Sequence, residues 1–502
     1  MTRWMRRLAG IAAGLAISTA AATATVSAAP RDAGRTPTVT GPITAGTGVS
    51  LIGPDLSSKG YVEEEYFIEG DAANYQPVGT LTSDGKWKVE KTDEQPYNTR
   101  VVVWKPADPA DFNGTVFVEW LNVSPGFDNP PDWLNSHNFF VRTGAAWVGV
   151  SAQAASVRGG ANPIQAEGAP PPGGLKAADP ERYGTLEHPG DAYSYDVFTQ
   201  GGLAVLGKGE GVKPFEGYDV KRVIAIGESQ SAGRMTTYVD AIHPLAKLYE
   251  GYLIHSRQGQ PSPFGDAVLG QDDPKVPNDV RIRRDLDVPV LLFQTEADLK
   301  LLRYLPARQP DSKNLRLWEA AGMSHADAYL GGLALADLGD GSAELALLDP
   351  AQATGGRLGC ASAVNANGQY AVVNAALARL ERWVRTGTPP PSYPRIQTTG
   401  SGDAATVVRD EHGIAKGGLR TPIVEVPLAT NDGEENSGPT FCRLFGHSKP
   451  FDAATLAALY PNGSGDYVKA FDKAVDKAVK AGIWLRPEAE HFKTAASQIT
   501  FG

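Results

Sequence analysis

Short apolar runs separated by helix-sized intervals are the feature that most restricts how this chain can fold. They occur at residues 100–104, 114–120, 145–150, 223–226, 252–254, 288–293 and 315–318. Strands of a parallel sheet are covered on both faces, so they appear as continuous apolar runs, and the intervals leave room for crossover helices. Earlier runs at 61–68 and 87–90 are interrupted by charges, which predicts an antiparallel edge. We therefore predict an α/β fold with a mostly parallel central sheet flanked by helices.

The run at 223–226 leads directly into a turn typical of a catalytic serine. The segment VIAIGESQSAGR (223–234) reads as strand, tight turn and helix, with Ser229 in the turn. A nucleophile elbow requires small residues two positions before and two after its serine, and Gly227 and Ser231 meet this requirement. The commoner pattern has glycine at both positions. The segment predicts Ser229 as a nucleophile.

An acid and a histidine follow Ser229 in the chain order expected for the α/β-hydrolase arrangement. The run VPVLLFQTEADL ends with Glu296 and Asp298, and LRLWEAAGMSHAD carries His325. A serine hydroxyl needs an imidazole to take its proton, and a carboxylate to orient that imidazole and stabilise its charged form. We predict His325 as the base and Asp298 as the acid, because Asp298 lies further into the loop. Glu296 remains the alternative acid.

Two backbone N–H groups are predicted to stabilise the oxyanion of a tetrahedral intermediate. One is that of Gln230, directly after the nucleophile. The other lies in the loop after the run at 114–120, at Leu121 or Asn122. Two further histidines are candidates for the pocket: His188, in a turn of the long segment 152–194, and His255, at a strand end, where it could also compete as the base.

The amino terminus and the charge of the chain bear on location and partners. Residues 1–28 combine basic, apolar and small-residue regions, as in a signal peptide, and residues 29–54 form a flexible Gly, Thr and Pro-rich leader. The apolar run is too short to favour a permanent membrane span after signal cleavage. A net charge of −10 argues against nucleic acid or an anionic membrane as a partner. We expect a secreted or cell-envelope protein.

A change of composition after the prolines at 389–391 divides the remainder into a core, 55–388, and a C-terminal appendage, 389–502, packed on it. In the core we expect a helix at 370–385 and long insertions at 152–194 and 256–285. In the appendage, strands are predicted at 407–408 and 422–426 and a helix at 467–480. Cys360 and Cys442 are the only two cysteines, and in an exported chain they predict one disulfide.

Metal and cofactor motifs are absent from the sequence. The two cysteines lack C-x-x-C spacing, and the eight histidines form no H-E-x-x-H pattern. We therefore predict no metal and no organic cofactor.

Several segments resemble a little-characterised family of α/β-hydrolase-domain proteins that are often exported from bacteria. They are FNGTVFVEWLN (112–122), GVSAQ (149–153), IGESQSAGR (226–234), IHSR (254–257), LWEAAGMSHAD (317–327) and GGLRTPIVEVP (417–427). The resemblance covers nearly the whole mature chain and implies the α/β-hydrolase fold and a triad of Ser229, His325 and an acid. It implies no substrate. The prediction is an exported serine hydrolase acting on small-molecule or polymeric carboxylic esters. The alternatives are a catalytically silent ligand-binding protein and an acyltransferase with the same triad.

Overall fold

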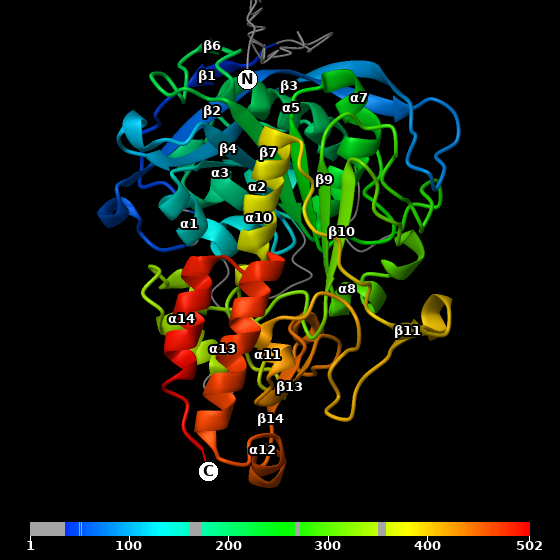
Figure 1. Ribbon diagram of the computed structural model, residues 1–502. Coiled ribbons are helices and arrows are strands. Elements are labelled where there is room, and N and C mark those ends of the chain that lie inside the picture. The colour runs from blue at the N-terminus through cyan, green and yellow to red at the C-terminus, as the bar shows by residue number, and fades with distance from the viewer. Residues whose placement is uncertain are drawn as a thin grey trace, which may run out of the picture.

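Figure 1 shows a computed structural model of the chain, which describes residues 36–49, 51, 53–160, 173–266, 272–349 and 358–501. The signal peptide predicted over residues 1–28 lies outside this part. Among the described residues, no helix is both long enough and apolar enough to cross a membrane.

Ten strands form the central sheet, and from β10 to β3 their order along it is that of an α/β hydrolase. From one edge to the other they are β10 (Leu315–Ala320), β9 (Val290–Thr295), β8 (Gly251–His255), β7 (Arg222–Glu228), β4 (Thr115–Trp120), β5 (Ala146–Val150), β3 (Val89–Pro106), β2 (Tyr61–Pro77), β1 (Thr38–Thr40) and β6 (Glu210–Gly211). The six from β10 to β5 are parallel. The mostly parallel sheet predicted from the apolar runs is therefore confirmed.

Helices cover both faces of this sheet. The α-helices are α1 (Pro131–Thr143), α2 (Ala154–Arg158), α3 (Gly174–Ala178), α4 (Pro180–Tyr183), α5 (Ser194–Val205), α6 (Gln230–Thr237), α7 (His243–Ala246), α8 (Glu296–Lys300), α9 (Ser342–Leu348), α10 (Gln369–Thr386), α11 (Pro422–Glu425), α12 (Ala453–Leu459), α13 (Ser464–Ala481) and α14 (Arg486–Ala496). Figure 1 shows α10, in yellow, crossing one face of the strands. The helices predicted at 370–385 and 467–480 are confirmed as α10 and α13.

The sequence of β4 explains how both faces are buried. Val116, Val118 and Trp120 join one apolar cluster, which contains residues of α5 and α6. Phe117 joins the other cluster, which contains residues of α1 and α10. Successive side chains of a strand point to opposite faces, so a strand between two helical layers is buried on both and is mostly apolar.

The antiparallel edge is longer than the sequence predicted. The end of the run at 87–90 and the whole run at 100–104 belong to a single strand, β3, which begins at Val89 and pairs with β2 along almost its whole length. The expected flexible leader, 29–54, is also wrong in part, because β1 lies within it. Val39 of β1 is buried and pairs with Ile68 of β2. Backbone pairing with β2 and β6 and the burial of Val39 hold this segment on the sheet.

Helices α13 and α14 pack against α1 and α10. Helices α13 and α14, red in Figure 1, lie together at the end of the molecule away from the N label. Their buried residues Phe471, Val475 and Phe492 belong to the same apolar cluster as α1 and α10. Glu488 of α14 adds an ion pair with Arg142 of α1. These contacts join the tail to the helical layer of the core.

Three shorter features complete this region. The predicted disulfide between Cys360 and Cys442 is present. Two small antiparallel pairs occur in the tail, β11 (Thr398–Thr399) with β12 (Thr406–Val407) and β13 (Ala429–Asp432) with β14 (His447–Pro450). The strand predicted at 422–426 is wrong, because these residues form the short helix α11. Pro422 occupies its first turn, where a missing N–H costs nothing, and this local preference outweighs the β-branched composition.

Candidate active site

Ser229 alone connects β7 to α6, and its backbone is strained. Its φ of 58° and ψ of −116° are rare for a residue with a side chain. The turn is held by the Ser229 N–H, which donates to the His255 carbonyl at 2.9 Å. The Ser231 hydroxyl donates to the Glu228 carbonyl at 2.8 Å, which shows how serine is accommodated where glycine is commoner. Ser229 is partly exposed, whereas its neighbours in the chain are buried.

The structure brings Ser229, His325 and Asp298 together from three strand ends. His325 lies in the loop after β10, and its Nε2 is 2.8 Å from the Ser229 Oγ. Its Nδ1 is 2.7 Å from the Asp298 Oδ1. A neutral imidazole that directs its Nδ1 proton to this carboxylate presents the lone pair of Nε2 to the serine. The second oxygen of Asp298 accepts from the Thr295 N–H at 2.7 Å, which fixes its orientation.

Charges around His325 favour its protonated form. Burial alone would lower the pKa of His325, but the carboxylates of Glu228 and Asp298 outweigh this effect and raise the pKa to about 9. Burial raises the pKa of Glu228 to about 7, although His325 and His255 act in the opposite direction. The imidazole therefore lies between two acids.

Glu296, the alternative acid, lies elsewhere. Its carboxylate is fully buried and is 2.7 Å from Arg409 of the C-terminal segment, and it accepts from the Gly322 N–H at 2.7 Å. Burial raises the pKa of Glu296 to about 7. Glu296 is the first residue of α8 and Asp298 the third, so their side chains leave the helix in different directions. Of the two carboxylates, the structure places Asp298 against His325.

The predicted oxyanion donors differ in whether they are free. Gln230 is the first residue of α6, where a backbone N–H has no acceptor within the helix. The Leu121 N–H donates to the Val150 carbonyl at 3.3 Å, and the Asn122 N–H donates to the Asn129 carbonyl at 2.9 Å. Backbone bonds to Val150 and Asn129, which no local pattern reveals, thus occupy both groups predicted as the second donor.

The two histidines predicted for the pocket are both held inside the protein. His255 is 1% exposed, with Nδ1 2.8 Å from Asp132 and Nε2 3.2 Å from the Gln369 amide. His188 is 2% exposed, with Nε2 2.9 Å from the Ala152 carbonyl, and its Nδ1 accepts from the Gly190 N–H. Burial lowers the pKa of His188. Both nitrogens of each ring already have partners, so neither ring offers a polar atom to a substrate.

Sequence reasoning missed Glu228 and, for Asn122, predicted only a role of the backbone. The Glu228 Oε1 is 3.2 Å from the His325 Nε2, and the Asn122 side chain donates to the Glu228 carbonyl at 3.0 Å. A signal for Glu228 exists in the sequence, because a carboxylate directly precedes the predicted nucleophile at the end of an apolar strand. The side-chain role of Asn122 has no such signal, since it depends on contact with β7.

No cluster of three or more potential metal ligands occurs in the part of the chain that the structure describes.

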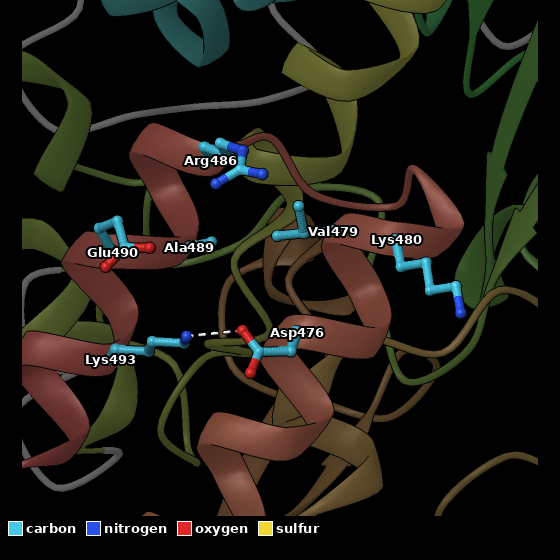
Figure 2. Close-up of a pocket in the computed structure, with 7 residues that line it drawn as sticks. All are labelled: Asp476, Val479, Lys480, Arg486, Ala489, Glu490 and Lys493. Atoms are coloured by element: carbon cyan, nitrogen blue, oxygen red, sulfur yellow. Dashed lines mark hydrogen bonds and ion pairs between the residues drawn. The ribbon is translucent and has the colours of Figure 1, made fainter.

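A surface hollow lies between α13 and α14, where Lys493 and Asp476 form an ion pair at 2.6 Å (Figure 2). Its lining combines cationic, acidic and small apolar side chains and includes none of the predicted site residues: Asp476, Val479, Lys480, Arg486, Ala489, Glu490 and Lys493.

A parallel sheet whose central strand ends in a strained serine, with an imidazole and a carboxylate supplied by later strand ends, defines an α/β hydrolase. The sequence profile of the family described as "Alpha/beta hydrolase domain" matches residues 33–494. The chain therefore belongs to this alpha/beta hydrolase domain family. No curated protein matches it.

Solved structures similar to this chain include hydrolases from several organisms. A putative dienelactone hydrolase from Klebsiella pneumoniae is 13% identical, with 50% of this chain and 85% of that chain covered and a TM-score of 0.25. An esterase from Rhizomucor miehei is 11% identical, with 67% of this chain and 87% of that chain covered and a TM-score of 0.31. A carboxylesterase from Lactobacillus plantarum is 9% identical, with 47% of this chain and 78% of that chain covered and a TM-score of 0.24. Similarity at this level carries no information about the substrate of this chain.

Proposed function

We propose that this protein is an exported serine hydrolase that cleaves small-molecule or polymeric carboxylic esters through an acyl-enzyme. One observation carries the proposal: the Ser229 Oγ lies 2.8 Å from the Nε2 of an imidazole whose Nδ1 lies 2.7 Å from the Asp298 carboxylate. This arrangement gives a hydroxyl both a base within reach and an acid that orients the base. The strained, partly exposed turn presents the hydroxyl to a substrate.

The proposed reaction has two balanced halves. In the first, neutral His325 takes the Ser229 proton while Oγ attacks the ester carbonyl, and the imidazolium then protonates the departing alcohol as the carbon–oxygen bond breaks. In the second, His325 takes a proton from water, which attacks the acyl carbonyl, and the proton returns to Ser229 as the acid is released. Asp298 keeps the ring in the required tautomer and stabilises its charged form.

The oxyanion of each tetrahedral intermediate needs donors that no protein group already occupies. The Gln230 N–H, at the first position of α6, is one. We assign the second to the N–H of Val123, which follows the two groups already used by backbone pairing. The Asn122 Oδ1 accepts from the Ser124 N–H at 2.8 Å, and this bond fixes the turn in which Val123 is the central residue.

The test is covalent labelling of the folded protein with a fluorophosphonate, together with hydrolysis of short p-nitrophenyl esters. The Ser229→Ala variant is expected to lose both. Ser231→Ala is the matched control, because it removes a hydroxyl of the same turn that bonds only to the Glu228 carbonyl. Labelling of Ser229→Ala at the wild-type level would refute the assignment.

The same experiment separates the alternatives. Folded wild-type protein that is not labelled would be a ligand-binding protein with a hydrolase fold. Labelled protein that transfers the acyl group to an added alcohol in preference to water would be an acyltransferase. Product analysis with acceptor alcohols distinguishes transfer from hydrolysis.

Export is supported by the signal-like amino terminus and by the Cys360–Cys442 disulfide, which an oxidising compartment favours. Expression of the full chain followed by amino-terminal sequencing of protein recovered outside the cytoplasm is expected to show cleavage after residue 28. An uncleaved chain retained in the cytoplasm would contradict export. We also propose residues 55–388 as the hydrolase core and 389–502 as its appendage.

A further inference from the structure

Glu228 and Ser229 face the same nitrogen of His325. Glu228 is the last residue of β7, its side chain is 6% exposed, and its Oε1 lies 3.2 Å from the His325 Nε2. The Ser229 Oγ lies 2.8 Å from that nitrogen. Nε2 has either one proton or one lone pair. With a proton it donates to the carboxylate, and with a lone pair it accepts from the hydroxyl.

The Glu228 carboxylate is held in this place by its neighbour across the sheet. Asn122 Nδ2 donates to the Glu228 carbonyl at 3.0 Å and reaches its Oε2 at 3.3 Å. Asn122 is itself fixed, because its Oδ1 accepts from the Ser124 N–H. With Oε2 engaged, Oε1 remains for the imidazole. The contact between Glu228 and His325 is therefore built into the turn.

Four charged or titratable groups surround Glu228. His325 and Asp298 lie on one side, in the loop after β10 and in α8. His255 of β8 is its register partner, and Asp132 of α1 is paired with His255. The two imidazoles favour the ionised form of Glu228 and the two aspartates oppose it.

We propose that Glu228 is a positioning residue that holds the imidazolium form of His325 and thereby sets the pH range in which Ser229 can be deprotonated. This inference rests on the proposed function. With Glu228 ionised, the imidazolium Nε2–H points to Oε1 and the serine has no base. When that proton leaves to solvent, Nε2 accepts from Ser229 and acylation can begin. During the reaction the proton moves from Oγ to Nε2, and the carboxylate stabilises the imidazolium that forms.

The raised pKa values agree with this geometry. The pKa of His325, about 9, means that the base becomes available only in alkaline solution. The pKa of Glu228, about 7, means that the carboxylate is largely ionised in that range. The acidic limb of wild-type kcat/KM is therefore expected to have its midpoint near pH 9, with a plateau at higher pH, since this limb reports the base of the free enzyme.

The main test is the pH profile of kcat/KM in Glu228→Gln, which keeps the shape of the side chain and removes its charge. The acidic limb is expected to move to lower pH by roughly 1–3 units, because an opposite charge at this distance has been removed. The alkaline plateau is expected to fall, because the imidazolium of the transition state loses a stabilising charge. Glu228→Asp, which keeps the charge, is expected to restore part of the limb position.

Glu296→Gln is the matched control. Glu296 is also a fully buried carboxylate with its pKa raised to about 7, but its partner is Arg409 rather than His325. The acidic limb of kcat/KM in Glu296→Gln is expected to coincide with that of the wild type. A Glu228→Gln limb at the wild-type pH, whatever the rate, would overturn the proposal and leave Glu228 a purely structural residue.

A measurement without substrate makes the inference separable from the proposed function. The proton between His325 Nδ1 and Asp298 is expected to give a low-field proton NMR signal, which is assigned by its loss in His325→Ala. Its titration midpoint is expected to fall in Glu228→Gln. An unchanged midpoint overturns the proposal even in an active esterase. Absence of fluorophosphonate labelling would overturn the proposed function and leave this titration valid.

Discussion

Two carboxylate–imidazole pairs lie at the carboxyl edge of the parallel sheet, and only one of them contacts a hydroxyl. In the first, His325 Nδ1 is 2.7 Å from Asp298. In the second, His255 Nδ1 is 2.8 Å from Asp132. Both imidazoles are buried, at 5% and 1% exposure. The two pairs are nearly the same in the distance from Nδ1 to the carboxylate and in the burial of the ring.

They differ at the second nitrogen. His325 Nε2 faces the hydroxyl of a strained, partly exposed turn, whereas His255 Nε2 faces the amide of Gln369 in α10. His255 is the last residue of β8, so its ring enters the layer between sheet and helices, where it also packs edge-on against Phe293. His325 is carried by a loop. The same kind of pair thus places a ring nitrogen against a hydroxyl in one place and joins helices to the sheet in the other.

The largest effect is expected from removing the base. His325→Ala should lower kcat/KM for a p-nitrophenyl ester by about 10⁵–10⁶-fold, because the hydroxyl loses its proton acceptor. Ester hydrolysis at different pH values and the urea midpoint are the measurements. A loss of less than tenfold in a folded protein would place the base elsewhere and make the two pairs equivalent.

The next effect concerns the acid of the first pair. Asp298→Asn keeps the shape of the side chain but favours the wrong imidazole tautomer, and kcat is expected to fall about 10⁴-fold. Glu296→Gln, on the same helix, is the control, because Glu296 bonds to Arg409 and not to His325. Equal losses of kcat in the two variants would reopen the choice between the two acids.

The second pair is expected to matter for stability. His255→Leu leaves the Asp132 carboxylate buried without its partner, so the free energy of unfolding is expected to fall by about 3–5 kcal/mol. kcat of the folded fraction should change by less than about tenfold, since the base remains. Urea unfolding and active-site titration check the two expectations. A loss of kcat comparable to that of His325→Ala would assign His255 to the reaction.

This pair also predicts a pH dependence of stability. Burial opposes the charged form of His255, but Asp132 and the other nearby carboxylates raise its pKa above the ordinary value of about 6.5. The contribution of charged His255 to the free energy of unfolding is therefore complete below about pH 6.5, and it is lost as pH rises through the raised pKa of His255 in the folded state. The stability difference between wild type and His255→Gln is expected to shrink in alkaline urea titrations. A difference that grows with pH would contradict this sign.

The smallest effect is expected from replacing Gln369, whose amide contacts the Nε2 of His255. Gln369→Leu removes the partner of His255 Nε2 and is expected to lower the free energy of unfolding by about 1–3 kcal/mol, through one unsatisfied buried group. The pH profile of hydrolysis should not move. A shifted profile would mean that the two pairs are coupled through Glu228 more strongly than their geometry indicates.

The sheet and the serine turn could be predicted because their signals are local. Consecutive apolar residues at 116–118 of β4 and 223–226 of β7 indicate strands covered on both faces, and Gly227 and Ser231 allow the turn around Ser229. The position of β1 and the helical conformation of α11 were not predictable in this way. The first depends on an available neighbouring strand, and the second on a proline that overrides β-branched neighbours.

The choices within the site illustrate the same limit. Sequence spacing left Glu296 and Asp298 as alternative acids. In the structure the Glu296 carboxylate is paired with Arg409, more than a hundred residues later in the chain. Spacing also suggested Leu121 or Asn122 as oxyanion donors, and backbone pairing with Val150 and Asn129 occupies them.

By itself the sequence determined the class of fold, the turn that carries Ser229 and the order in which Ser229, two acidic residues and His325 follow one another along the chain. These follow from steric and hydrophobic demands on neighbours in the chain. Only the tertiary structure decided which acid faces His325, which histidine faces Ser229 and how Glu228 comes to share the same nitrogen. A side chain acquires its partner through packing between segments far apart in sequence, and no local pattern encodes which segments will meet.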